Sequence, residues 1–512
     1  MIVELLVLVL GLWLYSRLKF VRQMRAIAKL PGLRQGTDLL SFPGNLWNLY
    51  LPWTRRFTLY KENGNDTISL VPYFAGRPAV YTSNMDVARQ VIGGSHRCDF
   101  LKPEEFSQTL LVWGVNLVAA DGDTWRTHRK VMGPAFSNSL YEMVWEKTAE
   151  IYKDIVHSEG WANRDVVETP VIQDVTFKLA LLVLANCGFG FPFSWSSPPT
   201  TANGEMSVLE ALSEMLKHQL VLMIPKKLWN LPFKALQSAK KSHDLIYAFM
   251  QEKVKERQAE IKQDGGFGTK TDAFSLLVRA NSQGEKTQLD ENELISNIYV
   301  LLFAGHETTA HTLAATLAYM CIYPKIQEEV FQQIQSVAGT GTDPIFADQA
   351  KLDKVMAIFY EAGRLFPAGW VMIRQAVKDT ILEVPNPIGE EGTTSLPLPE
   401  GTNVIVDMIG TQINDRYFEE PEKFKPERWY GLAPSDFEKV TTFSVGPRAC
   451  LGRKFAETEA VCFLTYLMRD YRVEALLSPG ETLHGWRERV LDANIMVTLG
   501  VKDVPLKFIR RT

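Results

Sequence analysis

A single cysteine in a glycine-bracketed segment constrains this sequence more than any other feature. The segment reads FSVGPRACLG over residues 443–452, and a helical pattern, LGRKFAETEAVCFLTYLM, begins near Leu451. Gly446 and Gly452 permit a tight turn that brings backbone N–H groups close to the sulfur of Cys450. Those donors, together with the positive end of the helix that follows, favour a thiolate. A lone cysteine is usually a small buried apolar side chain, so this setting predicts a different role.

A thiolate of this kind is a haem iron ligand, and it pushes electron density toward O–O cleavage. Arg448 supplies a planar fork suited to a carboxylate such as a haem propionate. The pattern FxxGxRxCxG, which starts at Phe443, resembles the haem-binding signature of the cytochromes P-450, and every fixed position is present. Ser444 stands where the family frequently has glycine. The motifs below occur in the family's order, so the resemblance covers essentially the whole chain.

The resemblance implies a mainly α-helical fold with a small β component and a haem b cofactor. Hydrophobic residues make up 46% of the chain and charged residues 22%, the proportions of a globular protein with a large core. We expect one haem domain over residues 31–512, behind an N-terminal segment of residues 1–30. Periodic apolar patterns predict helices, and short apolar runs punctuated by Pro and Gly over 376–407 predict strands. The helical patterns lie around 139–157, 205–220, 239–262, 292–320 and 325–337.

The helix predicted over 292–320 is interrupted by the sequence AGHETT, which begins at Ala304. Gly305 costs a helix about 0.5–1 kcal/mol, so it needs a reason, and one reason is space for a diatomic ligand against the backbone. Thr308 lies four residues after Ala304, so its hydroxyl can compete for that carbonyl and open the helix locally. The segment matches the family's A-G-x-[DE]-T-[TS] motif. The resemblance implies that Glu307 and Thr308 deliver protons during dioxygen activation, and it gives no role to His306.

Two further motifs suggest a structural network. Glu361 and Arg364 share one face of a helix in the apolar setting IFYEAGRLFP, which indicates that the pair is buried. A buried ion pair needs further partners to offset desolvation. The family resemblance supplies Arg428 from the segment Pro426–Trp429, where tryptophan replaces the usual phenylalanine. We expect a Glu361–Arg364–Arg428 triad that supports the haem loop and takes no part in chemistry.

Three other residues match positions at which the family contacts the haem propionates. Trp125 and Arg129 fit its WxxxR motif, and Arg374 follows the helix that carries Glu361. The alternative for each arginine is a solvent-facing cation, as most arginines are.

The chain has no nucleotide site of its own, because its two G-x-G segments lack the third glycine and no Gly-Lys-Ser/Thr follows. Electrons from NADPH must therefore arrive through a partner, for which the resemblance implies NADPH–cytochrome P-450 reductase, with cytochrome b5 as a second donor. A basic docking patch for an acidic partner is expected from residues near the cysteine and WxxxR motifs. These are Arg126, Lys130, Arg453 and Lys454. A net charge of −4 gives no support for nucleic-acid binding.

The substrate is expected to be lipophilic, because the segments that correspond to the family's variable recognition regions are apolar. A terpenoid, steroid or fatty-acid skeleton would suit them, and the sequence most resembles fungal microsomal members, many of which serve secondary metabolism. The segments lie around 100–118, 210–235, 297–304, 367–373 and 486–494. Their apolar residues include Phe100, Phe106, Leu110, Leu111, Val112, Trp113, Leu301, Phe303, Trp370, Val371, Met372 and the nearby Ile495.

The N-terminus is apolar over residues 5–16, and a cluster of basic residues follows from Arg17 to Lys29. A cleaved signal would place its basic residues first, so an uncleaved anchor in the endoplasmic reticulum membrane is expected, with the rest of the chain in the cytosol. The alternative is a buried N-terminal core helix. The five cysteines are odd in number and far apart, which fits a reducing compartment.

Three functions remain open from the sequence. The first is a reductase-dependent haem-thiolate monooxygenase that inserts one oxygen atom from O2 into a C–H bond. The second is an enzyme of the same fold that rearranges peroxides or dehydrates oximes, and the intact Glu307–Thr308 pair argues against it. The third is a haem-binding protein without catalytic activity.

Overall fold

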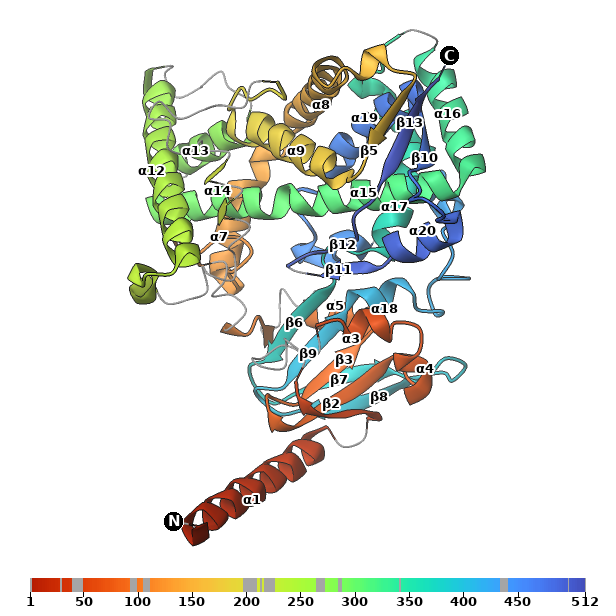
Figure 1. Cartoon of the computed structure of the whole chain (residues 1–512). Coiled ribbons are helices and arrows are strands. Elements are labelled where there is room, and N and C mark those ends of the chain that lie inside the picture. The colour runs from red at the N-terminus through yellow and green to blue at the C-terminus, as the bar shows by residue number, and fades with distance from the viewer. Residues whose placement is uncertain are drawn as a thin grey trace.

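Helices form most of the molecule in the computed structural model, and a smaller group of sheets lies beside them (Figure 1). The expectation of a mainly α-helical fold with a small β component is confirmed. The structure describes residues 2–27, 30–38, 49–92, 99–104, 111–196, 210–211, 214–215, 226–263, 272–283, 288–339, 342–432, 441–495 and 497–511.

The helices are α1 (Ile2–Ala26), α3 (Leu51–Thr54), α4 (Leu59–Asn63), α5 (Met85–Ile92), α7 (Gly122–Met132), α8 (Asn138–Ser158), α9 (Gln173–Val183), α12 (Lys234–Gln263), α13 (Ala273–Gln283), α14 (Glu291–Gly305), α15 (Glu307–Ile322), α16 (Pro324–Ala338), α17 (Asp353–Leu365), α18 (Met408–Gln412), α19 (Arg453–Asp470) and α20 (Leu483–Val490). The predicted helix over 205–220 falls mostly outside the described residues.

The strands are β1 (Gly32–Thr37), β2 (Thr67–Ala75), β3 (Ala79–Thr82), β4 (Phe100–Leu101), β5 (Val166–Thr169), β6 (Val371–Ala376), β7 (Thr380–Pro385), β8 (Thr393–Leu398), β9 (Asn403–Asp407), β10 (Tyr471–Ala475), β11 (Ala493–Ile495), β12 (Leu499–Val501) and β13 (Leu506–Arg510). The region 376–407, expected to be β-like, contributes β7, β8, β9 and the end of β6.

A long helix crosses the middle of the helical part and is divided into α14 and α15 at His306 (Figure 1). Its start is fixed by a capping box, in which the Asp290 side chain accepts from the backbone N–H of Glu293 and the Glu293 side chain accepts from that of Asp290. Beyond its polar first turns α15 is rich in alanine and apolar residues, and most of its residues are buried. It packs against α9, α16, α17 and α19.

The largest hydrophobic core surrounds α15 and joins α8, α9, α17 and α19. The cysteine loop lies directly before α19, and the Glu361–Arg364 motif lies on α17, so both are anchored in this core. One end of the site is therefore held by tightly packed helices.

The main sheet has six strands in the order β1-β2-β3-β9-β6-β4. Strand β6 runs antiparallel to β9, which is buried along its whole length, and Arg374 lies opposite Val404 in that register. A second small sheet pairs β11 with β12, and β12 packs against α15. Strand β6 contributes Val371, Met372, Ile373 and Arg374 to the lining of the site.

Helix α1 extends away from the main sheet (Figure 1), and two contacts join it to β2. The Ser16 hydroxyl donates to the carbonyl of Tyr73 at 2.7 Å, and the rings of Phe20 and Tyr73 stack at 4.3 Å between centroids. Within the described part of the chain, no helix combines the length and the apolar character needed to cross a membrane.

Candidate active site

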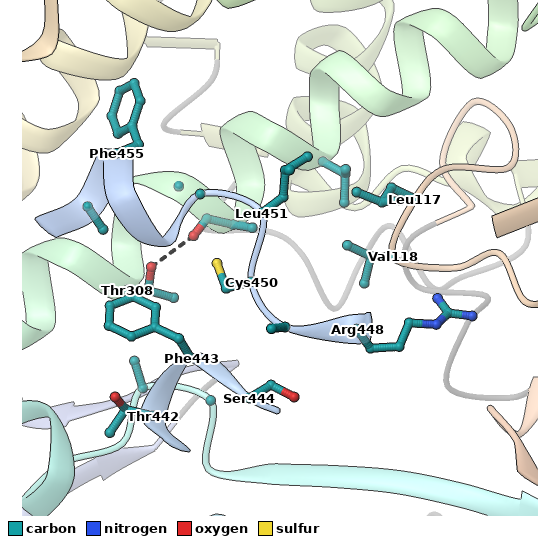
Figure 2. Close-up of a pocket in the computed structure, with 18 of the residues that line it drawn as sticks. Leu117, Val118, Thr308, Thr442, Phe443, Ser444, Arg448, Cys450, Leu451 and Phe455 are labelled. Carbon is teal, nitrogen blue, oxygen red and sulfur yellow. Dashed lines mark hydrogen bonds between the residues drawn. The ribbon is translucent and has the colours of Figure 1, made fainter. Parts of the chain in front are cut away.

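A largely apolar cavity of about 620 Å³ lies where α15, the cysteine loop, α7 and β6 meet. Cys450 enters it from the loop and Thr308 from α15, as Figure 2 shows. Most of the residues predicted from sequence line this one space. They are Trp125, Arg129, Ala304, Gly305, Thr308, Arg374, Phe443, Arg448 and Cys450.

The cysteine loop is a tight turn closed by backbone hydrogen bonds. The N–H of Cys450 donates to the carbonyl of Phe443 at 2.8 Å, and the N–H of Ala449 donates to that of Gly446 at 3.0 Å. Gly446 has a φ of +68°, which confirms the turn predicted for it. Ser444 also adopts a left-handed conformation, with a φ of +65°, at the position where glycine is frequent in the family. Its hydroxyl lies 3.4 Å from the sulfur of Met372.

The side chain of Cys450 lies deep in the protein but opens onto the cavity. Burial raises the pKa of its thiol above the ordinary value, although the backbone N–H of Gly452 and the guanidinium of Arg129 act in the opposite direction. Burial therefore opposes the thiolate that these donors favour. A metal cation deprotonates a coordinating thiol outright, so the ligand state depends on the metal itself.

The break between α14 and α15 places a threonine hydroxyl at the cavity wall. The Thr308 hydroxyl donates to the carbonyl of Ala304 at 2.9 Å (Figure 2), which confirms the predicted competition for that carbonyl. Gly305 also serves packing, which the sequence reasoning missed. A Cβ at this position would come within 3.2 Å of the Leu184 side chain, which belongs to a π-helical turn after α9.

Glu307 does not line the cavity, in contrast to its neighbour Thr308. Its carboxylate turns toward His311 on the next turn of α15, with 3.8 Å between Oε1 and Nε2. Burial raises the pKa of Glu307, but His311, Thr498 and His306 more than offset it, so the pKa lies below its ordinary value. The Glu307 carboxylate therefore lies behind Thr308, outside the cavity, and its neighbours favour the ionised form.

Cationic side chains line one edge of the cavity. Arg129 on α7 and Arg374 on β6 reach it without an acidic partner among the described residues, and burial lowers the pKa of both. Arg448 is different, because it pairs with Asp121 and donates to the carbonyl of Ala120 at 2.9 Å. Its guanidinium also lies 4.3 Å from the ring centroid of Trp125.

Lys102, just after β4, is a fourth cation at this edge, and the sequence analysis missed it. Its ammonium donates to Ala120 O at 3.0 Å and lies 3.4 Å from Asp121, so it shares both acceptors with Arg448. Burial lowers the pKa of Lys102 to about 7, and Arg448 and Arg374 lower it while Asp121 raises it. A lysine outside any motif gives no signal in the sequence, because only the chain trace brings it here.

The structural triad is present and completely buried at its centre. The Arg364 guanidinium makes two bonds to the Glu361 carboxylate, at 2.8 and 2.9 Å, and Arg428 lies 3.3 Å from the same group. The Trp429 indole donates to Glu361 at 2.8 Å. This tryptophan, which replaces the usual phenylalanine of the family, supplies a hydrogen bond that phenylalanine cannot make.

The four residues of the expected basic patch differ in exposure and in their partners. Arg453 donates to Glu457 at 2.7 Å in a network with Tyr360, so it belongs to the interior as much as to the surface. Lys130 and Lys454 are exposed, and Arg126 is exposed and paired with Asp123. Arg453 is therefore only partly exposed, unlike the other three residues.

The predicted substrate-recognition residues fall into several groups. Leu301, Val371 and Met372 line the cavity. Trp113 instead packs in a cluster with His243, Tyr247 and Tyr299, and Val112 and Ile495 lie in the core. Phe106 and Leu110 lie outside the described residues. Leu117, Val118 and Val300 line the cavity and were not singled out. Phe100, Leu111, Phe303 and Trp370 are absent from the described lining.

These features suit a planar apolar ring with carboxylates along one edge. The cavity offers an accessible sulfur from the loop, apolar walls, and the cations Arg129 and Arg374 that lack acidic partners among the described residues. Arg448 and Lys102 would complete the charged edge. The donor set therefore fits haem b, with Cys450 as the residue that would bind its iron.

Comparisons with known proteins agree with this site. Residues 39–491 match the family model described as Cytochrome P-450. The chain is 31% identical, over 99% of its length and 100% of the relative's, to Cytochrome P-450 monooxygenase 124 of Postia placenta. It is 25% identical to the phomenoic acid biosynthesis cluster cytochrome P-450 monooxygenase of Leptosphaeria maculans, over 84% of this chain and 80% of the relative.

Solved structures show the same fold at low sequence identity. A zebra fish cytochrome P-450 solved with progesterone superposes with a TM-score of 0.68 and 19% identity, over 92% of this chain and 100% of that one. The haem domain of cytochrome P-450DA gives a TM-score of 0.71 and 18% identity, over 94% and 99% of the two chains. The chain belongs to the cytochrome P-450 family of haem-thiolate monooxygenases and resembles its fungal members.

Proposed function

We propose that this enzyme hydroxylates a lipophilic small molecule, with electrons that pass from NADPH through a reductase. The observation that carries the proposal is the cavity, where a cysteine sulfur and a threonine hydroxyl face the same apolar space. The overall balance is RH + O2 + 2 electrons + 2 protons giving ROH + H2O. When bound, the thiolate-ligated haem supplies the reductive activation of dioxygen.

The chain's own residues divide the remaining work. Cys450 would hold the iron from the loop side, while Arg129, Arg374, Arg448 and Trp125 orient the propionate edge. The Thr308 hydroxyl would position protons at the opposite wall, and Glu307 would supply them from behind. The apolar wall around Leu301 would exclude water and select the substrate by shape. A terpenoid, steroid or fatty-acid skeleton is the substrate class we propose.

The reductase would dock where α7, α8 and α19 begin or end near the loop. Lys130 and Lys454 are the exposed cations there, and they would attract an acidic partner. Neutralising both should slow reductase-supported turnover at low salt and have less effect at high salt. Unchanged turnover at low salt would remove this face as the docking site. Cytochrome b5 could use the same cations.

We further propose that α1 attaches the enzyme to the endoplasmic reticulum membrane. The support is a group of exposed apolar side chains on α1, which includes Leu12, Trp13 and Leu14. A helix of this kind can lie in a lipid interface. Replacing Leu12 and Leu14 with glutamate should release the full chain from microsomes, and retention would contradict the attachment.

The function is tested by expression in microsomes with reductase, NADPH and a lipophilic extract, followed by mass spectrometry of the products. Thr308→Ala should keep NADPH oxidation but lose product, because its hydroxyl faces the cavity. Thr316→Ala is the matched control, since its hydroxyl makes the same bond to the carbonyl four residues earlier but is buried away from the cavity. Equal coupling in wild type and Thr308→Ala would remove Thr308 from the mechanism. Product formed without reductase would favour an isomerase or dehydratase.

A further inference from the structure

The carboxylate of Glu307 lies in a small polar site behind the cavity wall. It is placed at the first turn of α15, and the side chain is 17% exposed. His311 lies on the same face of that helix, one turn later, because residues four apart are neighbours on a helix. Thr498, in the turn between β11 and β12, faces the same carboxylate.

The His311 ring is held from two other elements. The ring of Phe177 on α9 meets it edge-on, at 90° and 4.9 Å between centroids. Gly500 on β12 packs directly against the imidazole, since a Cβ at that position would lie 2.0 Å from Nδ1. Nδ1 itself is buried and has no hydrogen-bond partner among the described residues. The ring is therefore fixed in place with Nε2 directed at Glu307.

Among the described residues, few charged groups surround Glu307. The titratable groups that act on it are His311 and His306, both from the broken helix. On α9 the neighbouring residue is Phe177, and Lys178 of that helix lies over Trp195, 3.9 Å from its ring centroid. The β11–β12 hairpin contributes Thr498 and Gly500, which carry no charge. His311 lowers the pKa of Glu307 more than Thr498 does, against the effect of burial.

His306 has a different setting, although it precedes Glu307 directly. Its Nδ1 lies 2.9 Å from the carbonyl of Leu302, and the side chain is buried. Burial lowers the pKa of His306 below its ordinary value. This histidine is thus engaged by the backbone of its own helix, and His311 is the one directed at the carboxylate.

We propose that His311 is a positioning residue for Glu307, which restrains the carboxylate behind Thr308 and sets the pH range over which it serves proton delivery. The inference rests on the proposed role of Glu307 in the monooxygenase reaction. It assigns a function to the spacing of Glu307 and His311 and to the glycine at position 500. No group besides the two side chains and solvent protons is required.

The first test is an infrared pH titration of the resting holoprotein, in which the Glu307 band is identified by its loss in Glu307→Gln. His311→Leu should raise the carboxyl midpoint by about one unit or more, because an opposite charge or donor at this range is lost while burial stays. His311→Gln keeps a donor and should restore most of the difference. Gly500→Ala, which displaces the ring, should shift the midpoint as His311→Leu does.

His484→Asn is the control, because His484 and Glu488 form an i, i+4 pair in the reverse order on the exposed face of α20, with 3.4 Å between Nε2 and Oε1. It should leave the Glu307 band unchanged. An unchanged midpoint in His311→Leu overturns the proposal, whether or not the enzyme turns over.

The second test is product formed per NADPH across pH, with the substrate found in the microsomal screen. In His311→Leu the acidic limb should move to higher pH, with a severalfold loss of coupling at the acid end. A shifted infrared midpoint with an unchanged pH profile overturns the role of the pair in proton delivery. If the wild type makes no product at all, the proposed function fails, and the infrared titration still decides whether His311 controls Glu307.

Discussion

Ser444 shows how one residue can carry strain inside a motif. Its φ of +65° lies in the left-handed region, which costs a residue with a Cβ roughly 1–2 kcal/mol. The loop nevertheless keeps this geometry, because the backbone bonds around Gly446 and Cys450 close the turn. A glycine at this position would adopt the same conformation without that cost.

We therefore predict that Ser444→Gly stabilises the holoprotein by about 0.5–1 kcal/mol, since relief of strain exceeds the added flexibility of the unfolded chain. The measurement is the midpoint of denaturant unfolding, monitored by haem absorbance. Ala449→Gly is the control, because Ala449 has a φ of −53° and gains nothing from glycine. A lower midpoint for Ser444→Gly would show that its contact with Met372 matters more than the backbone.

Individual site residues could be predicted where they belong to a sequence motif, but not where only the folded chain brings them together. Cys450, Thr308 and Glu361 lie in motifs whose resemblance to the family implied their roles. The effect of burial on the Cys450 thiol could not be read from the loop sequence, because desolvation depends on everything packed around it. Gly305 was recognised, but Leu184, which needs its missing side chain, lies more than a hundred residues away.

At the scale of elements, a buried network links α17 to the turn at Pro426–Trp429. Arg364 donates to the carbonyls of Gln412 and Pro421 at 2.7 Å, so it also ties down the segments before that turn. The Glu361 carboxylate is fully enclosed and receives bonds from Arg364, Trp429 and the backbone of Lys425. A buried charge needs every one of these partners.

We predict that Trp429→Phe destabilises the holoprotein by about 1–3 kcal/mol, because a buried carboxylate loses a donor. This change introduces the residue that the family usually has. The expected loss of stability therefore comes from the lost hydrogen bond and not from an unusual residue at this position. The measurement is the free energy of unfolding by denaturant. Trp195→Phe is a matched control with a smaller expected loss, since its indole donates at 2.8 Å to the exposed carboxylate of Glu159. Equal losses in the two variants would refute the argument.

Element boundaries followed the sequence pattern closely where packing is regular. The patterns at 139–157 and 325–337 correspond to α8 and α16 within about two residues, which is the usual uncertainty at helix ends. The pattern at 292–320 is interrupted at AGHETT, and the structure breaks the helix within that motif, at His306. The motif indicated a local opening, but only the hydroxyl bond of Thr308 shows where the helix opens.

At the scale of the whole molecule, the cavity edge is assembled from four distant parts. Lys102 follows β4, Asp121 precedes α7, Arg374 lies on β6, and Arg448 lies in the cysteine loop. Nothing in the sequence brings Lys102 to this edge, because its neighbours form no motif. The sequence pattern could not predict contacts between residues this far apart in the chain.

We predict that haem retention depends on the charge of Lys102, whose pKa burial lowers to about 7. An anionic propionate prefers the protonated ammonium and raises its pKa, so the affinity should fall as pH rises from that value through the higher pKa of the bound state. The dissociation constant of haem, measured at neutral pH and at alkaline pH, should therefore rise more in wild type than in Lys102→Met. Lys378→Met is the control, since Lys378 is exposed and pairs with Asp99. Identical pH dependence in Lys102→Met and wild type would exclude the contact.

The account depends on ligation of haem iron by the sulfur of Cys450, and the absorption spectrum of the reduced carbon monoxide complex tests it most directly. The wild type should show the strongly red-shifted Soret band of thiolate ligation. Cys450→Ala should lose that band, while Cys462→Ala, which removes a buried thiol twelve residues later in α19, should keep it. A wild-type spectrum without the shift, or a shifted band that survives in Cys450→Ala, would contradict the central claim.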